Sequence, residues 1–309
     1  MIQDLTLRSS KVLIIGYGEM GHTMEFLLHE KHQLAIHDCR SIAGLQPVDL
    51  EKEAAQSDFV LFCLPTNPHD ELLQRIAPLL PAHCICLSIA KGLDEQGRTA
   101  ARCFAEHLDA RQQPYGLLYG PMISEELRAS RYGFAEFGCT DSATYQKVRQ
   151  LYQGTDLYIR HSTDIAGISW SVILKNVYAI SFGAADELQL GDNMRGFLAV
   201  IALEELSAIV EQMGGQPATP YHLAGLGDLI TTATSIDSHH HELGCMLARG
   251  ETGDIKGEGV FTLKMVAKHK LFDTSALPLY NLVHQIVTQP NNVAGSIRDF
   301  VKTMHRIEC

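Results

Sequence analysis

The sequence predicts an α/β domain with a doubly wound, mostly parallel sheet in residues 1–160, followed by an all-α domain in residues 161–309. In the first half, short aliphatic runs typical of buried strands alternate with helical patterns, which favours a parallel sheet with helices on both faces. Beyond His161 almost no segment has a strand pattern. A chain of 309 residues is also long enough for two domains with their own cores.

The elements of the first half follow from apolar runs, turn residues and helical spacing. Strands are expected at residues 11–15, 33–37, 59–64, 84–88, 116–119, 133–137 and 157–159, and helices at residues 24–30, 70–80, 99–108 and 143–152. In the second half, Asp192 is expected to cap a helix that stops at Gly214-Gly215, and a further helix follows Ser238 and ends near Arg249.

Composition and charge exclude several classes of function. A formal net charge of −11 and 46% hydrophobic residues describe an acidic globular protein, which argues against a nucleic-acid partner or an anionic membrane. The eight cysteines form no CxxC pair and several stand in strand-like runs, so they are expected to be reduced, small apolar residues. Without a secretory or lipid-attachment pattern at its ends, the chain is expected to be cytoplasmic.

A glycine motif in strand–helix context indicates dinucleotide binding. Gly16, Gly18 and Gly21 follow an aliphatic run and precede a helical pattern, as in a Rossmann domain. We expect Gly16 to form the tight turn, Gly18 to admit the pyrophosphate and Gly21 to let helix and strand pack closely. Asp38 ends the second predicted strand and favours NAD by bonding the ribose, although Arg40 leaves NADP possible.

The segment from Ile165 to Ala185 predicts a buried helix with one charged side chain, Lys175. Apolar residues occur on all its sides, and the lysine and asparagine at its centre argue against a membrane span. Burial would lower the pKa of Lys175 and make it a proton donor and acceptor. A lysine that reaches solvent or forms a structural ion pair is the alternative.

Seven short motifs then occur in a characteristic order. They are residues 16–21 (GYGEMG), 90–93 (AKGL), 120–121 (GP), 174–180 (LKNVYAI), 191–195 (GDNMR), 225–229 (GLGDL) and 257–260 (GEGV). With this set the chain resembles the NAD(P)-dependent glycerol-3-phosphate dehydrogenases over nearly its full length. The resemblance implies the interconversion of sn-glycerol 3-phosphate and dihydroxyacetone phosphate, a role in glycerophospholipid metabolism, and a homodimer.

The resemblance also implies roles for individual residues. Catalytic roles are implied for Lys175, Lys91 and Asp228, with Lys175 as the proton donor and acceptor. Cofactor contacts are implied for Gly16, Tyr17, Gly18, Glu19, Met20, Gly21, Asp38, Pro65, Ser124 and Glu258. Substrate contacts are implied for Lys91, Gly120, Met122, Asp228, Thr232, Ser238, His239 and His240. No metal site is expected, because adjacent histidines on a helix do not share a face.

The chain departs from the family pattern at three places. The stretch from Cys39 to Gln56 is short, Met122 replaces a Ser or Thr, and residues 239–241 are His-His-His where the family has the phosphate-gripping Arg-Asn-Arg. A dehydrogenase of another small hydroxy compound, such as a 3-hydroxy acid, is therefore an alternative. A dinucleotide-binding protein without catalysis is a second alternative, although Lys91, Lys175 and Asp228 weigh against it.

Overall fold

The computed structural model describes the backbone of residues 9–235, 238–253 and 255–307, and side chains as far as residue 304. The chain divides into two compact units. Residues up to Ala90, together with Arg98–Ile165, form the first unit, whereas Lys91–Gly97 and the residues from Ala166 onward form the second. The predicted domain division after residue 160 stays a prediction, and the short segment Lys91–Gly97 belongs to the compact unit formed by the C-terminal helices.

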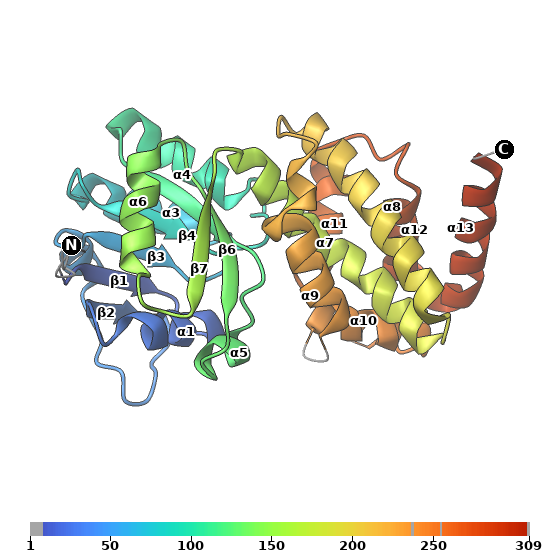
Figure 1. The fold of residues 1–309 in the computed structure, drawn as a ribbon, viewed down its shortest axis with the longest axis horizontal. Coiled ribbons are helices and arrows are strands. Elements are labelled where there is room, and N and C mark those ends of the chain that lie inside the picture. The colour runs from blue at the N-terminus through green and yellow to red at the C-terminus, as the bar shows by residue number, and fades with distance from the viewer. Residues whose placement is uncertain (1–8, 236–237, 254, 308–309) are drawn as a thin grey trace, which may run out of the picture. The chain divides into compact units, whose positions relative to one another are not determined.

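The first unit contains a mostly parallel sheet, drawn in blue to green in Figure 1. Its strands are β1 (Lys11–Ile15), β2 (Gln33–His37), β3 (Phe59–Phe62), β4 (Ile85–Ser88), β5 (Tyr115–Tyr119), β6 (Gly133–Gly138) and β7 (Leu157–Ser162). Their spatial order is β2-β1-β3-β4-β5-β6-β7, and only the β5–β6 pair is antiparallel. This arrangement confirms the predicted doubly wound sheet, whose order reverses between β1 and β3.

Helices accompany the strands of this sheet. They are α1 (Glu19–Leu28), α2 (Leu50–Ala54), α3 (His69–Ile76), α4 (Ala100–Leu108), α5 (Ser124–Arg128) and α6 (Ser142–Leu151). Residues of α1, α5 and α6 share one core cluster with alternate residues of the strands. Phe62 on β3 packs instead against Phe104 of α4, with ring centroids 5.2 Å apart. Burial on both faces explains the continuous apolar runs of the central strands. The five-residue helices α2 and α5 were not predicted, because so few residues carry no periodic pattern.

The second unit is helical in the residues that the structure describes. Its helices are α7 (Ile165–Glu187), α8 (Gly191–Gln212), α9 (Asp228–Thr234), α10 (His239–Ala248), α11 (Glu258–His269), α12 (Pro278–Thr288) and α13 (Val293–Ile307). By length and composition α7 could cross a membrane, but 89% of its most apolar window is buried inside the protein. The helix is therefore the core of the unit, as its all-round apolar sequence predicts.

Close packing around α7 depends on small residues. A Cβ at Gly183 of α7 would lie 1.8 Å from the carbonyl oxygen of His241, and one at Gly244 of α10 would lie 2.0 Å from that of Ile180. A side chain at either position would separate the two helices. These glycines therefore set the distance at which α10 and its histidines approach α7.

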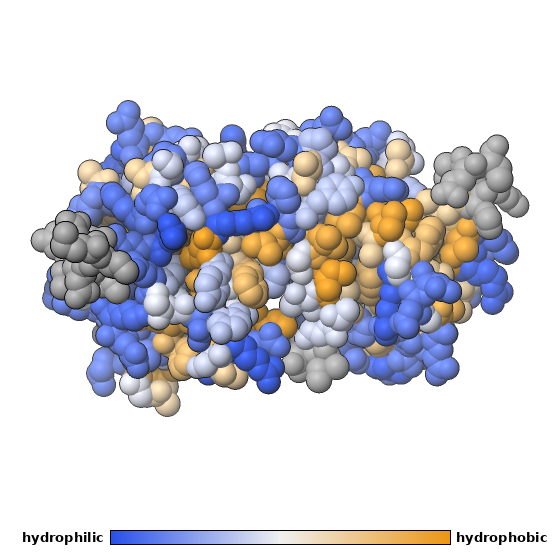
Figure 2. All heavy atoms as spheres, in the orientation of Figure 1, coloured by the Kyte–Doolittle hydropathy of each residue, from blue (hydrophilic) through white to orange (hydrophobic). Residues whose placement is uncertain are grey.

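Helix α8 differs from its prediction in two respects. It begins at Gly191 with Leu190 in the capping position, so the prediction that Asp192 caps the helix is wrong; Asp192 lies within the first turn and pairs with Arg195. Apolar side chains also reach the surface over α8 (Figure 2), where Val200 is 55% exposed. Because α8 has apolar residues on its buried and exposed sides, its sequence shows little helical periodicity.

The cysteines mostly behave as the sequence predicts. Among the described residues, Cys63, Cys84, Cys86, Cys103, Cys139 and Cys245 are buried free thiols. Cys39 is an exception because it is exposed, and Cys309 lies outside the described residues.

Candidate active site

Helix α7 places Lys175 inside the second unit. The side chain lies near the middle of this helix and is 6% exposed, so the predicted burial is confirmed. Its Nζ lies 3.3 Å from Oδ1 of Asp228 and donates a hydrogen bond to Oγ1 of Thr232. Both partners belong to α9, on successive turns of one helix face. Lys175 therefore has a fixed direction and defined partners, and does not reach out to solvent.

Asp228 joins two lysines. A π-helical turn, Leu223–Gly227, leads directly into α9, so that Asp228 is its first residue. While Oδ1 faces Lys175, Oδ2 accepts a hydrogen bond of 2.7 Å from Nζ of Lys91. The Asp228 side chain is only 4% exposed. One buried carboxylate thus serves two amines, an arrangement in which one of the amines can lose its proton without leaving the carboxylate unpaired.

The charge state of Lys175 is tuned by its surroundings. Burial lowers the pKa of Lys175 from 10.5 to about 8; Asp228 opposes this change and the charge of Lys91 reinforces it. Burial dominates because the free energy needed to remove an ammonium from water is larger than the stabilisation it gains from a carboxylate that it shares with a second amine. A lysine with this pKa exchanges a proton near neutral pH, which suits general acid and base catalysis.

A second carboxylate lies beside the cluster formed by Lys91, Lys175, Asp228 and Thr232. Glu258 is the first residue of α11, and its Oε2 accepts a hydrogen bond of 3.2 Å from Nδ2 of Asn176. The same amide lies 3.4 Å from the carbonyl oxygen of Lys91. Burial raises the pKa of Glu258, although Lys175 and Lys91 act in the opposite direction. Asn176 therefore links helix α7 to the start of α11 and to the segment that carries Lys91.

The three adjacent histidines have different environments, because successive residues of a helix point about 100° apart. Ser238 caps α10 by accepting a hydrogen bond of 3.3 Å from the backbone N–H of His241. His239 is exposed. Nε2 of His240 accepts a hydrogen bond of 3.2 Å from the backbone N–H of Gly259, so its ring proton is on Nδ1. Burial and the charge of Lys175 lower the pKa of His240 to about 3, which keeps this ring neutral.

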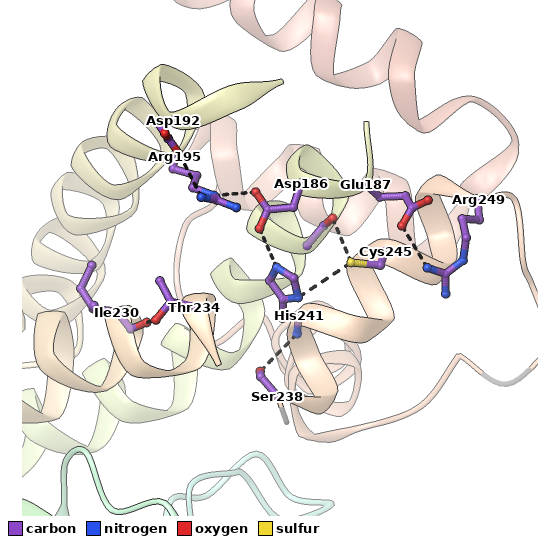
Figure 3. Close-up of polar contacts among 11 residues, drawn as sticks. Asp186, Glu187, Asp192, Arg195, Ile230, Thr234, Ser238, His241, Cys245 and Arg249 are labelled. Carbon is purple, nitrogen blue, oxygen red and sulfur yellow. Dashed lines mark hydrogen bonds and ion pairs between the residues drawn. The ribbon is translucent and has the colours of Figure 1, made fainter. Parts of the chain in front are cut away.

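His241 belongs to a separate polar cluster, shown in Figure 3. Its Nε2 lies 2.8 Å from Oδ2 of Asp186 on α7, whose Oδ1 accepts a hydrogen bond of 2.7 Å from Nε of Arg195 on α8. On the other side of the ring, Nδ1 lies 3.8 Å from the Sγ atom of Cys245. His241 therefore fastens α10 to α7 and α8.

The glycine loop lies in the first unit, at the carboxyl end of β1. Gly16 has φ +94°, and a Cβ there would lie 2.6 Å from the carbonyl oxygen of Cys63. A Cβ at Gly21 would lie 2.2 Å from the carbonyl oxygen of Gly16, whereas a Cβ at Gly18 would meet no atom within 4 Å. Gly16 and Gly21 thus allow the turn and the helix to pack closely, whereas Gly18 leaves space for a ligand at the start of α1. This arrangement fits a dinucleotide, whose phosphates favour a helix N-terminus.

Asp38 supports the same loop. Its Oδ2 accepts a hydrogen bond of 2.8 Å from the backbone N–H of Tyr17. The Tyr17 hydroxyl in turn donates to Glu25 of α1, and burial together with Glu25 raises the pKa of this tyrosine to about 12. These contacts connect the end of β2, the glycine loop and the first helix. Asp38 and Glu25, which both lie outside the glycine motif, therefore stabilise the loop through Tyr17.

The remaining predicted site residues of the first unit have varied surroundings. Glu19 is exposed at the start of α1, Met20 packs against the core, and Pro65 is exposed beyond β3. The buried Ser124 donates to the carbonyl oxygen of Glu19 and lies 2.9 Å from the Thr23 hydroxyl, which attaches α5 to α1. Gly120 has φ +151°, and the Met122 side chain lies in the hydrophobic core. Their predicted ligand contacts stay predictions.

Comparison with known proteins decides the family. Residues 45–144 and 164–298 match the family models for the N-terminus and C-terminus of NAD-dependent glycerol-3-phosphate dehydrogenase. The glycerol-3-phosphate dehydrogenase [NAD(P)+] of Azotobacter vinelandii is 30% identical over 268 residues, which cover 84% of this chain and 78% of that protein. The chain belongs to the NAD-dependent glycerol-3-phosphate dehydrogenase family.

Two further comparisons extend the likeness across nearly the whole chain. The glycerol-3-phosphate dehydrogenase [NAD(P)+] of Agrobacterium fabrum is 26% identical over 324 residues, which cover 96% of this chain and 98% of that protein. The crystal structure of glycerol-3-phosphate dehydrogenase from Coxiella burnetii has the same fold, with a TM-score of 0.82 and 23% identity over 95% of this chain and 99% of that one. The family resemblance stated from short motifs is thus confirmed.

Within this glycerol-3-phosphate dehydrogenase family, the histidine run is the main departure of the chain. Of the three residues that replace Arg-Asn-Arg, His240 is neutral and holds the start of α11, and His241 is engaged with Asp186. Only His239 is exposed among the three. A doubly donating, permanently charged arginine is therefore replaced by one exposed imidazole.

The predicted site of this dehydrogenase family member omitted one residue that the structure places in the cluster. Asn176 follows Lys175 directly and contacts Glu258 and the backbone of Lys91. A sequence signal for it exists, because it is a second strongly polar residue at the centre of a helix that is otherwise apolar on all sides. A polar group buried at such a position needs a partner.

Proposed function

We propose that this chain is an NAD(P)-dependent glycerol-3-phosphate dehydrogenase that interconverts sn-glycerol 3-phosphate and dihydroxyacetone phosphate. The observation that carries the proposal is the buried Lys175, whose Nζ faces Asp228 and Thr232. Family membership supports the choice of reaction. The bound nicotinamide supplies the acceptor or donor of hydride, and the residues of the chain supply the proton transfer and the charges.

Lys175 moves the proton in this proposal. During oxidation, hydride leaves the carbon of the secondary alcohol with its bonding electrons, and the neutral Lys175 amine takes the hydroxyl proton and becomes an ammonium. During reduction, the ammonium returns the proton to the carbonyl oxygen as the carbon gains hydride. A pKa of about 8 makes both forms accessible near neutral pH.

The other residues of the cluster hold Lys175 ready for this step. Asp228 orients it and stabilises the ammonium, while Oγ1 of Thr232 accepts a hydrogen bond from its Nζ and so fixes the direction of the amine. Lys91 shares Asp228 and supplies positive charge for an anionic substrate. Asn176 and Glu258 attach the segment of Lys91 to α7 and α11.

One observation favours a second candidate function. Because His240 and His241 are occupied by Gly259 and Asp186, the histidine run offers a weaker grip on phosphate than Arg-Asn-Arg. A dehydrogenase of a small hydroxy compound without phosphate, such as a 3-hydroxy acid, would keep Lys175 and need no such grip.

A substrate panel separates the two candidates. The purified protein would be assayed with NADH and NADPH against dihydroxyacetone phosphate, dihydroxyacetone and short-chain 3-oxo acids. Preferred reduction of dihydroxyacetone phosphate supports the proposal. Equal or faster reduction of an unphosphorylated ketone would replace it by the second candidate. The proposal includes a homodimer, a cytoplasmic location and a role in glycerophospholipid metabolism, to be tested by sedimentation, cell fractionation and lipid labelling in a deletion strain.

A further inference from the structure

The short segment Lys91–Gly97 lies along helix α11, within the same compact unit. At one end of the segment, a Cβ on Gly92 would lie 3.8 Å from Oε1 of Glu258, the first residue of α11. At the other end, a Cβ on Gly97 would lie 3.1 Å from Cδ2 of His269, the last residue of that helix. The segment therefore follows α11 from its beginning to its end.

The backbone carbonyl of Glu95 is bonded to the last two residues of α11. Its oxygen lies 2.9 Å from Nε2 of His269 and accepts a hydrogen bond of 3.2 Å from Nζ of Lys268. A carbonyl oxygen can only accept, so the proton of the His269 ring that faces it is on Nε2. Two side chains of one helix thus tie this carbonyl to the end of α11.

The segment has little slack between its two attachments. The four peptide units from Lys91 to Glu95 span at most about 14 Å. Helix α11 has 12 residues and is therefore about 18 Å long. After this stretch the chain turns, with a hydrogen bond of 3.0 Å from the N–H of Gly97 to the carbonyl oxygen of Asp94. A displacement of Glu95 would consequently move Lys91, because no loose loop lies between them.

The position of Lys91 affects the charge of Lys175. Nζ of Lys91 lies 2.7 Å from Oδ2 of Asp228, while Oδ1 of the same carboxylate faces Lys175. Burial lowers the pKa of Lys175 most, the charge of Lys91 lowers it further, and Asp228 and Glu258 oppose both. The neutral ring of His240 adds no charge. Moving Lys91 away would remove a repulsion and leave Asp228 to Lys175 alone, and both effects favour the ammonium form of Lys175.

We propose that His269, together with Lys268, positions Lys91 for the reaction. The two side chains act through the carbonyl of Glu95, from the opposite end of α11. The inference rests on the proposed function, in which Lys91 supplies positive charge for an anionic substrate and Lys175 transfers the proton. It goes further by giving a role in the reaction to two residues that lie a helix length away from the reacting cluster.

The test compares variants of the full chain. His269→Ala removes one donor to the carbonyl of Glu95, whereas His269→Gln keeps a side-chain N–H and should act as the conservative rescue. The matched control is His29→Ala. His29 also stands at the end of a helix, α1, and its Nδ1 contacts backbone carbonyl oxygens, those of Glu25 and Phe26.

Steady-state rates would be measured in both directions between pH 6.5 and 10. In His269→Ala the KM for dihydroxyacetone phosphate should rise about two- to tenfold, the range for the loss of one hydrogen bond, because Lys91 is less well placed. The pH of half-maximal oxidation rate should move above the native value near 8, because Lys175 then holds its proton more strongly. His269→Gln should restore both quantities, and His29→Ala should change neither.

A purely structural role of His269 predicts a different result. The alanine variant would then be less stable toward urea but would keep the native KM and pH profile, and this outcome would overturn the inference. A change of equal size in His269→Gln would also overturn it. Lys268→Met removes the other donor from an exposed position and should shift the same two quantities in the same directions, so the test does not depend on the folding of one variant.

Chemical labelling separates this inference from the proposed function. The rate at which acetic anhydride acetylates Lys175 would be followed against pH by mass spectrometry, which requires no turnover. His269→Ala should move the labelling midpoint to higher pH. If the native chain reduces no ketone phosphate but this shift is present, the proposed function fails and the positioning of Lys91 is supported. An unchanged midpoint in an active enzyme would reject the positioning alone.

Discussion

Replacement of Lys175 by methionine tests the proposed catalytic role and the physical cause of the lysine's low pKa together. Methionine is one heavy atom shorter than lysine and has a similar unbranched apolar stem, so α7 should stay packed. It removes the proton carrier, and loss of general acid and base catalysis should reduce turnover at least about 10²-fold. Because Asp228 keeps its 2.7 Å contact with Lys91, no buried carboxylate is left unpaired.

The same change should make the protein more stable. A lysine whose pKa falls on folding destabilises the fold wherever the folded protein must hold that proton, which is below its folded pKa. The pKa of Lys175 falls from 10.5 to about 8, which corresponds to roughly 3 kcal/mol at pH 7. This penalty should shrink as the pH rises above 8 and vanish above 10.5. Lys175→Met removes the penalty, so its advantage over the native chain should be largest at neutral pH.

Urea unfolding at pH 7, 8 and 9.5 and steady-state rates with dihydroxyacetone phosphate would provide both measurements. The control is Lys264→Met, which replaces an exposed lysine of α11 and should change neither quantity. An inactive Lys175→Met chain that is more stable at pH 7, with the difference shrinking toward pH 9.5, supports the reasoning. A variant with native turnover, or one that is less stable by the same amount at every pH, would refute it.

Three further predictions follow from the second unit. Asp228→Asn should move the pH of half-maximal oxidation rate below the native value near 8, because burial and the charge of Lys91, which lower the pKa of Lys175, are then opposed only by Glu258; an unchanged profile would contradict the pairing. Burial raises the pKa of Glu205 on α8 from 4.5 to about 7, although hydrogen bonds from backbone N–H groups of α12 act against it. Between pH 4.5 and 7 the free energy of unfolding of the native chain, measured with urea, should therefore fall by roughly 3 kcal/mol relative to that of Glu205→Gln. A difference that stays constant with pH would argue against a buried titrating carboxyl group. His239→Arg should lower the KM for dihydroxyacetone phosphate about tenfold and leave that for dihydroxyacetone unchanged; equal effects on both would remove His239 from the phosphate grip.

Much of the fold could be predicted from local sequence. The central strands β1, β3 and β4 are buried on both faces, so their runs of aliphatic residues are visible without knowledge of their neighbours. The glycine loop is equally local, since the turn, the open approach and the close packing each need a glycine at one position. The burial of Lys175 follows from the helix that surrounds it, because a helix apolar on every side has no face to expose.

The tertiary structure decided what these residues contact. Lys91, Lys175 and Asp228 are separated by 84 and 53 positions in the chain, and only packing brings one carboxylate between the two amines. The sequence also left Asp38 and Arg40 as competing signals, whereas the structure joins them in one ion pair. Likewise, three identical histidines are divided by helix geometry into an exposed ring, a neutral acceptor and an anchor to Asp186. Residue type determines which chemistry is possible, but the pKa, the partner and the exposure of a side chain depend on neighbours that are distant in sequence.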